Sequence, residues 1–200
     1  MNVGSVVLLN RHEHLAAWFV ACLVSFSLIS GVRPVHAADL TIESVTPQWQ
    51  ENVYQLDARI HYNLNAPALE ALRKGVAIVM VLDVEVFQQS PWYWPEKTIA
   101  SLEQRYQIKY HALTERYLLT NLNTGVQSGF PSLQSALDVL GGVMGLPVLD
   151  RQLLEEGTAY AARMRARLDL DALPAPVRLL AYVTPGWRQS SDWYEWKLAH

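Results

Sequence analysis

The sequence predicts a mainly β fold, namely an antiparallel β-sandwich that is immunoglobulin-like in general architecture and carries two short helices. Three observations lead to this prediction. Apolar and polar residues alternate with a period of two in several segments, only two segments show clear helical spacing, and no regular succession of strand and helix indicates a parallel sheet. The chain has 200 residues, of which 50% are hydrophobic and 18% are charged, and this composition is typical of a folded globular domain.

The first half of the chain is expected to contribute three strands and one helix. Residues 39–45 predict a short strand, and residues 54–64 alternate strictly between apolar and polar side chains. Residues 65–74 predict a short helix for which Asn65 is the candidate cap. Residues 76–87 are apolar on both faces until two acidic residues interrupt, which indicates a central strand covered on both sides at one end.

The middle of the chain predicts a loop followed by a hairpin. Two prolines bracket three aromatic residues in segment 90–95, which favours a loop or an irregular sheet edge. Residues 99–112 and 115–122 are expected to be strands. Residues 123–125 give a turn signal, after which the hairpin continues through residues 126–128.

The last part of the chain is the hardest to assign. Residues 132–142 predict the second helix, which two glycines end, and residues 143–156 are expected to be a loop with one helical turn. Helix propensity favours a helix over residues 158–169, but strict alternation favours a strand, and we follow the alternation. The pattern gives no assignment for residues 177–183, and residues 194–198 predict a final strand.

Residues 1–37 have the three parts of a secretory signal peptide. A weakly basic start precedes an uncharged apolar run over residues 15–29, and residues 35–37 place small or short side chains before a cut. The run is shorter than the roughly 20 residues of a spanning helix, so we favour cleavage over the alternative of an inner-membrane anchor. Cys22 follows a poor lipobox, so we do not expect a lipid anchor. We therefore expect a periplasmic protein with a single domain at residues 38–200.

The composition of residues 38–200 excludes several classes of site. The whole chain has 16 Lys and Arg against 19 Asp and Glu; the loss of two Arg and one Glu with the signal leaves 14 against 18, a net charge of −4. An acidic chain has no electrostatic basis for binding nucleic acid. The single cysteine lies in the signal, so we expect no disulfide and no thiol nucleophile. We also expect no cofactor and no metal, because the histidines are not spaced as zinc ligands and no glycine-rich phosphate loop is present.

Aromatic residues are the most informative candidates for a binding site. Trp92, Tyr93 and Trp94 are consecutive between two prolines, and only Trp92 and Trp94 can share one face of a strand. Exposed, they would form a platform for a sugar ring or a contact patch for a protein partner. Buried, they would be ordinary packing of a sandwich without disulfides. We favour burial for most of the aromatic residues, because indole rings are costly to leave in water.

Charged residues provide the other two candidates. Asp83 and Glu85 are two positions apart on one predicted strand and about 6.6 Å from each other, a geometry that suits acid–base or glycosidase chemistry. We favour the alternative that they pair with basic residues across strands. Arg163, Arg165 and Arg167 share one strand face and are candidates for binding an anion, although a solvated face balanced by acidic neighbours is the simpler interpretation. We expect no catalytic residues.

Several ordered segments resemble a known family. They are the Pro91–Trp94 segment, the Tyr110–Tyr117 segment, the helix start at Phe130–Leu133, the stretch from Leu168 to Pro176 and the Ser190–Trp193 segment. Together they resemble the bacterial exported family called domain of unknown function 4390, over nearly all of residues 38–200. The resemblance implies a periplasmic or membrane-associated protein with no established activity and no catalytic residues to transfer. It also implies, through genes for a membrane sensor kinase that often lie nearby, a role in envelope signalling.

Three functional hypotheses follow from these patterns. The first is a non-enzymatic interaction module that contacts a membrane or envelope protein, such as a sensor kinase, through the loop at Trp92–Trp94. The second is a carbohydrate-binding module that uses the same aromatic side chains. The third, which we favour least, is a hydrolase that depends on the carboxylates of Asp83 and Glu85. The small-molecule ligand, if there is one, is unknown from the sequence.

Overall fold

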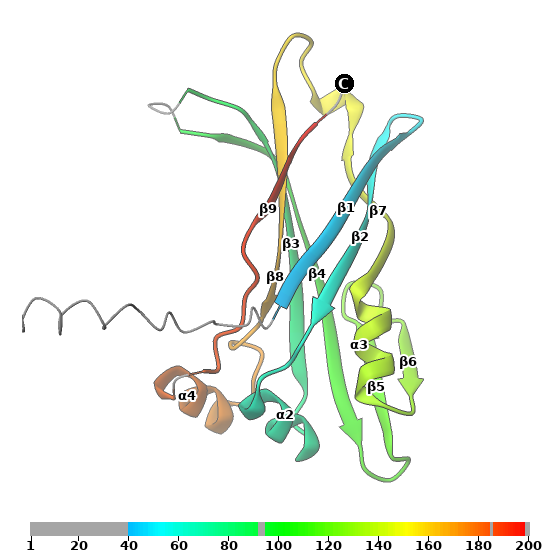
Figure 1. Ribbon diagram of the computed structural model, residues 1–200, viewed down its shortest axis with the longest axis vertical. Helices are drawn as coiled ribbons and strands as arrows, with labels where there is room; N and C mark the ends of the chain where they lie inside the picture. Colours follow the sequence, from blue (N-terminus) through cyan, green and yellow to red (C-terminus); the bar gives the residue numbers. More distant parts are fainter. Residues whose placement is uncertain (1–39, 92–94, 185, 199–200) are drawn as a thin grey trace, which may run out of the picture. The chain divides into compact units, whose positions relative to one another are not determined.

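The computed structural model describes residues 40–91, 95–184 and 186–198. Every described residue belongs to one compact unit, Ala37–His200. The described part is mainly β, with two antiparallel sheets and three α-helices (Figure 1). The predicted class, mainly β with antiparallel sheets, is therefore confirmed.

The smaller sheet has three strands. Its order is β1 (Leu40–Gln50), β2 (Val53–Tyr62) and β7 (Gly142–Asp150). The alternation in β2 buries every second side chain, from Tyr54 to Tyr62, on one face of the sheet, as a period of two requires. This confirms the strand predicted from the pattern at residues 54–64.

The larger sheet has six strands, and β3 lies in its interior. The order, from one edge to the other, is β6 (Gln127–Phe130), β5 (Arg116–Asn121), β4 (Lys97–His111), β3 (Ile78–Gln88), β8 (Tyr160–Leu168) and β9 (Tyr194–Lys197). Residues 78–82 of β3 are buried on both faces, as the apolar sequence predicted for a central strand. The strand prediction for residues 158–169 is also confirmed, because β8 pairs with β3 over its whole length.

Two helices begin with a side-chain cap, and the cap of α2 is the Asn65 that the sequence predicts. Helix α2 (Ala66–Arg73) begins after Asn65, whose side-chain oxygen accepts a hydrogen bond from the backbone N–H of Ala68 at 2.9 Å. Helix α3 (Leu133–Gly141) begins after Ser132, whose hydroxyl accepts from Ser135 N–H at 3.1 Å. Helix α3 lies beside β5 and β6 (Figure 1).

A third helix corrects the prediction of two. Helix α4 (Ala175–Val183) covers the segment that the pattern left unassigned, and Pro176 occupies its first turn. The segment is short and carries apolar residues on its outward side as well, so its pattern did not separate a helix from a buried strand. In Figure 1, α4 and α2 lie at the same end of the sheets.

The expected loop at residues 143–156 is also corrected. Most of it is strand β7, and only the three-residue 3₁₀ helix η1 (Arg151–Leu153) corresponds to the helical turn that was expected. Two register shifts against β2 interrupt the alternation, Gly145 has a φ of +58°, and Pro147 lies within the strand. Bulges of this kind remove the period of two from the sequence while the strand keeps its pairing.

The main hydrophobic core contains side chains from both sheets. Leu56 and Ile60 of the smaller sheet belong to the same buried cluster as Leu82 and Met164 of the larger sheet. A second, smaller cluster gathers around Tyr54 and Tyr160. With β3 buried on its core face, alternate residues of β3 and β8 must project from the opposite face of the larger sheet, which is where the charged candidates lie.

Candidate functional site

The charged candidates lie on the face of the larger sheet that points away from the main core. Val84 is fully buried, whereas Asp83 and Glu85 on either side of it are partly exposed. In the antiparallel register, Asp83 lies opposite Arg165 and Glu85 lies opposite Arg163. The sheet therefore places each acidic residue of β3 directly across from a basic residue of β8.

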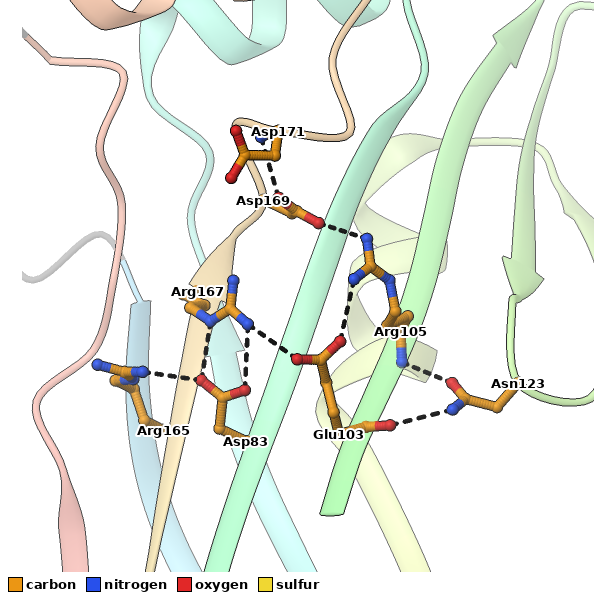
Figure 2. A network of polar contacts seen from close by, with 8 residues as sticks. All are labelled: Asp83, Glu103, Arg105, Asn123, Arg165, Arg167, Asp169 and Asp171. Atoms are coloured by element: carbon orange, nitrogen blue, oxygen red, sulfur yellow. Dashed lines mark hydrogen bonds and ion pairs between the residues drawn. The ribbon is translucent and has the colours of Figure 1, made fainter. Parts of the chain in front are cut away.

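Asp83 is the centre of the network in Figure 2. Its carboxylate accepts a hydrogen bond from Arg165 Nη2 at 2.9 Å. Arg167 binds the same carboxylate with two nitrogens, Nε at 2.8 Å and Nη2 at 3.2 Å. The side chain of Asp83 is only 14% exposed, so these charge-assisted hydrogen bonds are formed largely out of water.

The network continues onto β4 and the loop after β8. Arg167 Nη2 also donates to Glu103 at 3.1 Å, and Arg105 donates to Glu103 at 3.0 Å from the other side. Arg105 further binds Asp169, whose side chain is nearly buried (Figure 2). Arg167 thus bridges Asp83 and Glu103, two like charges that lie directly opposite each other on neighbouring strands.

Glu85 is the centre of a second, adjoining group. Arg163 binds Glu85 through Nε at 2.8 Å and Nη2 at 2.7 Å, and it also reaches Glu96 at 3.2 Å. The guanidinium of Arg163 lies 5.0 Å from the centroid of the Trp193 ring, and that of Arg165 lies 4.3 Å from the same ring. All three arginines of the predicted row are thus engaged with carboxylates, and two of them also pack on an indole.

The arginines determine the protonation of Asp83. Burial alone would raise the pKa of Asp83, but hydrogen bonds from Arg167 and Arg165 and their positive charges outweigh burial, and the pKa is lowered from its usual value. A carboxyl that acts as a general acid near neutral pH needs the opposite shift. The lowered pKa of Asp83 and the pairing of Glu85 with Arg163 therefore give no support to hydrolase chemistry.

The aromatic candidates Trp92, Tyr93 and Trp94 lie outside the described residues. Among the described indoles, Trp187 is buried, and Trp196 donates a hydrogen bond from Nε1 to the hydroxyl of Tyr54 at 2.9 Å. These two rings are part of the packing rather than an open platform.

An unexpected feature is the outward face of α4. Leu179 and Val183, one turn apart, are 70% and 71% exposed, and Leu180 is 56% exposed. A groove of about 400 Å³ runs between α4 and α2 and is lined mainly by apolar residues, Leu180 among them. Sequence reasoning missed this surface because it did not assign the helix, although a proline in a first turn followed by leucine and alanine is a helix signal.

Comparison with known proteins identifies the family. The family model described as domain of unknown function (DUF4390) matches residues 37–197. The chain belongs to this family. No curated protein and no solved structure matches the chain. This match confirms the family resemblance that the ordered sequence segments indicate.

The described part of this DUF4390 chain contains neither a cluster of metal ligands nor a membrane-spanning helix. No group of three or more His, Cys, Asp and Glu side chains in residues 40–91, 95–184 and 186–198 could hold a metal ion. The same ranges contain no helix that is both long and apolar enough to cross a membrane. One buried side-chain polar atom among them lacks a hydrogen-bond partner, the Nε of Arg165.

The lowered pKa of Asp83 predicts how the stability of the DUF4390 chain depends on acid. A carboxyl whose pKa is lower in the folded state contributes stability above its unfolded pKa of about 3.9, and this contribution is lost as the pH falls through the folded pKa. We expect the free energy of unfolding to fall below about pH 4, and to fall less steeply in Asp83→Asn.

Urea unfolding at several pH values between neutrality and about pH 3 measures this dependence. The pKa of Glu70 is also lowered, by the hydrogen bond and charge of Lys74. Protonation of Glu70 therefore affects the stability of the chain in the same pH range. The comparison of wild type with Asp83→Asn isolates the contribution of Asp83, and equal acid slopes in the two proteins would contradict the prediction.

Proposed function

We propose that this DUF4390 chain is an exported, non-enzymatic interaction module of the bacterial envelope, located in the periplasm after removal of residues 1–37. The observation that carries the proposal is the outward face of α4. Leu179 and Val183 are each about 70% exposed on a helix whose inward side is already packed through Ala181. An exposed apolar patch on a folded protein commonly marks an interaction surface.

The charged face of the larger sheet supports a role without catalysis. The arginines at 163, 165 and 167 each form at least one ion pair with a carboxylate, and the pKa of Asp83 is lowered. These contacts suit a rigid scaffold better than a reactive centre, because reactive carboxylates are commonly held with raised pKa values. The family resemblance adds a membrane or envelope protein, such as a sensor kinase, as a candidate partner.

We further propose that the two sheets pack as a β-sandwich. A buried cluster that contains side chains of β2, β3 and β8 supports this arrangement. The immunoglobulin-like comparison stays a prediction. The larger sheet keeps β6, β5, β4 and β3 as consecutive neighbours, which is a meander, and its order does not by itself support immunoglobulin-like connections.

A binding experiment with envelope membranes tests the proposed function. We expect the wild-type chain to sediment with envelope membranes from bacteria, and Leu179→Asp combined with Val183→Asp to reduce this binding at least tenfold, because charges then replace two apolar side chains that the bound partner would cover. Leu113→Asp is the matched control, since Leu113 is 93% exposed in the turn between β4 and β5. Equal binding of the α4 double variant and the control would overturn the proposal.

A further inference from the structure

Helix α4 differs from an ordinary surface helix. Its nine residues include one charged side chain, Arg178, and its outward positions are apolar. The exposed face of α3, in contrast, carries Gln134 and Asp138 beside Val139, and the two polar side chains hydrogen-bond to each other at 2.8 Å. A helix that is apolar on all sides is normally covered on all sides. Within the described residues, nothing covers the face of α4 that presents Leu179 and Val183.

The surroundings of this apolar face are basic. The segments Ala66–Lys74 and Leu170–Arg188 contain four basic and two acidic residues, although residues 38–200 as a whole have more acidic residues. Glu70 is paired with Lys74 at 2.6 Å. Asp171 accepts from the hydroxyl of Tyr182 at 2.6 Å, and its carbonyl accepts from Arg178 at 2.9 Å.

Two further basic residues are uncommitted. Neither Arg73, in the last turn of α2, nor Arg188, shortly after α4, forms an ion pair with a carboxylate of the described residues. Arg188 and Tyr182 line one common depression beside α4, together with Asp169 and Asp171, whose carboxylates are already bound to Arg105 and to the Tyr182 hydroxyl. Arg188 thus lies beside the helix that carries the apolar face, and Arg73 lies on α2, the helix across the groove from α4.

We infer that α4 binds the surface of an anionic phospholipid bilayer, with its apolar face in the boundary between headgroups and acyl chains. This inference rests on the proposed function and names the binding partner. Exposed leucine and valine side chains flanked by basic residues are the pattern of helices that lie in a membrane interface. Arg73 and Arg188 supply positive charge for lipid phosphates. Tyr182, half exposed with its hydroxyl tied to Asp171, provides an amphipathic ring of the kind found at headgroup depth.

Charge argues against a second copy of the chain as the occupant. A symmetric dimer through α4 would bring the same patch of both copies together, and the basic borders would then face each other. Like charges at such an interface oppose association. A negatively charged bilayer would bury the apolar side chains of α4 and attract the basic residues near them.

Protein-free vesicles test the inference. The exported chain is mixed with vesicles of phosphatidylcholine alone or with roughly one-third phosphatidylglycerol, and bound protein is measured by sedimentation. We expect about tenfold or greater preference for the anionic vesicles, a decrease of about fivefold for each of Arg73→Gln and Arg188→Gln, and weaker binding at high salt. Leu179→Asp with Val183→Asp should remove binding, and Leu113→Asp should not.

A second measurement does not depend on the double variant. Residues 38–200 contain no cysteine, so Leu179→Cys carries a single environment-sensitive dye, and Leu113→Cys is its control. We expect a blue shift of the dye at position 179 with anionic vesicles and no shift at position 113. A dye at position 179 that stays in water while the protein binds would overturn the inference.

The outcomes separate the inference from the proposed function. If the chain binds envelope membranes through α4 but ignores anionic vesicles, and protease treatment of the membranes abolishes binding, the occupant is a protein. In that case the inference fails and the interaction module stands. If substitutions in α4 change binding to neither envelope membranes nor vesicles, both fail.

Discussion

Gly141→Ala is expected to destabilise the folded chain by about 3 kcal/mol or more, through a clash that no side-chain rotation can relieve. A Cβ atom at position 141 would lie 2.2 Å from the backbone carbonyl oxygen of Ile60 and 3.3 Å from its carbonyl carbon. Gly141 is the last residue of α3, and this close approach brings the helix against β2. Because the contact is with backbone, either the helix or the strand must move.

The next residue provides the matched control. A Cβ at Gly142 would meet its nearest atoms at 3.7 and 3.8 Å, which is ordinary contact, and the residue has a φ of −95°. Gly142→Ala is expected to change stability by less than about 1 kcal/mol, because the added methyl group meets no clash and reduces the entropy of the unfolded chain. Urea unfolding of both variants measures the difference, and equal midpoints would contradict the close packing of α3 on β2.

Elements with a regular period were predictable from sequence. In β8, three arginines alternate with Ala162, Met164, Ala166 and Leu168, and this alternation outweighed a helical propensity that pointed the other way. Tertiary pairing with β3 on one side explains why, since a central strand is selected by burial on alternate positions. In β7 the bulges removed the same signal, so the strand could not be recognised.

The sequence could predict which charged residues form the candidate site, but it could not predict which of them pair with each other. The sequence places Asp83 and Glu85 on one face and the arginines on another strand, and pairing across strands was the favoured interpretation. Which arginine meets which carboxylate depends on the register of β3 with β8, which only the fold provides. The involvement of Asp169 and Glu103 through Arg105 depends on three separate segments and has no local signature.

The α4 surface was missed for the same reason that makes it informative. A helix that is half buried in its own domain shows an apolar stripe and a polar stripe, and sequence analysis recognises the contrast. In α4, Leu179, Leu180 and Val183 place apolar side chains on the outward positions as well. The exposed apolar positions thus indicate a second covering surface, which we infer to be a bilayer.

Asp83→Asn is expected to lower the free energy of unfolding by about 3 kcal/mol at neutral pH, because it removes one charge and preserves volume. Arg165 has no other carboxylate partner among the described residues, and its side chain is 33% exposed. Arg167 keeps Glu103 but loses its bidentate partner. Two half-buried guanidinium groups would then face an amide that cannot balance their charge.

A double-mutant cycle separates this pairing from a general effect of the substitution. Arg167→Met keeps the apolar stem while removing the charge, and we expect the two changes together to cost less than their sum by about 1–2 kcal/mol. Glu70→Gln, which disrupts the exposed pair with Lys74, is the control and should have little effect. Strict additivity in the cycle would mean that the contacts in Figure 2 contribute no coupling, and that the charged face is solvated rather than a scaffold.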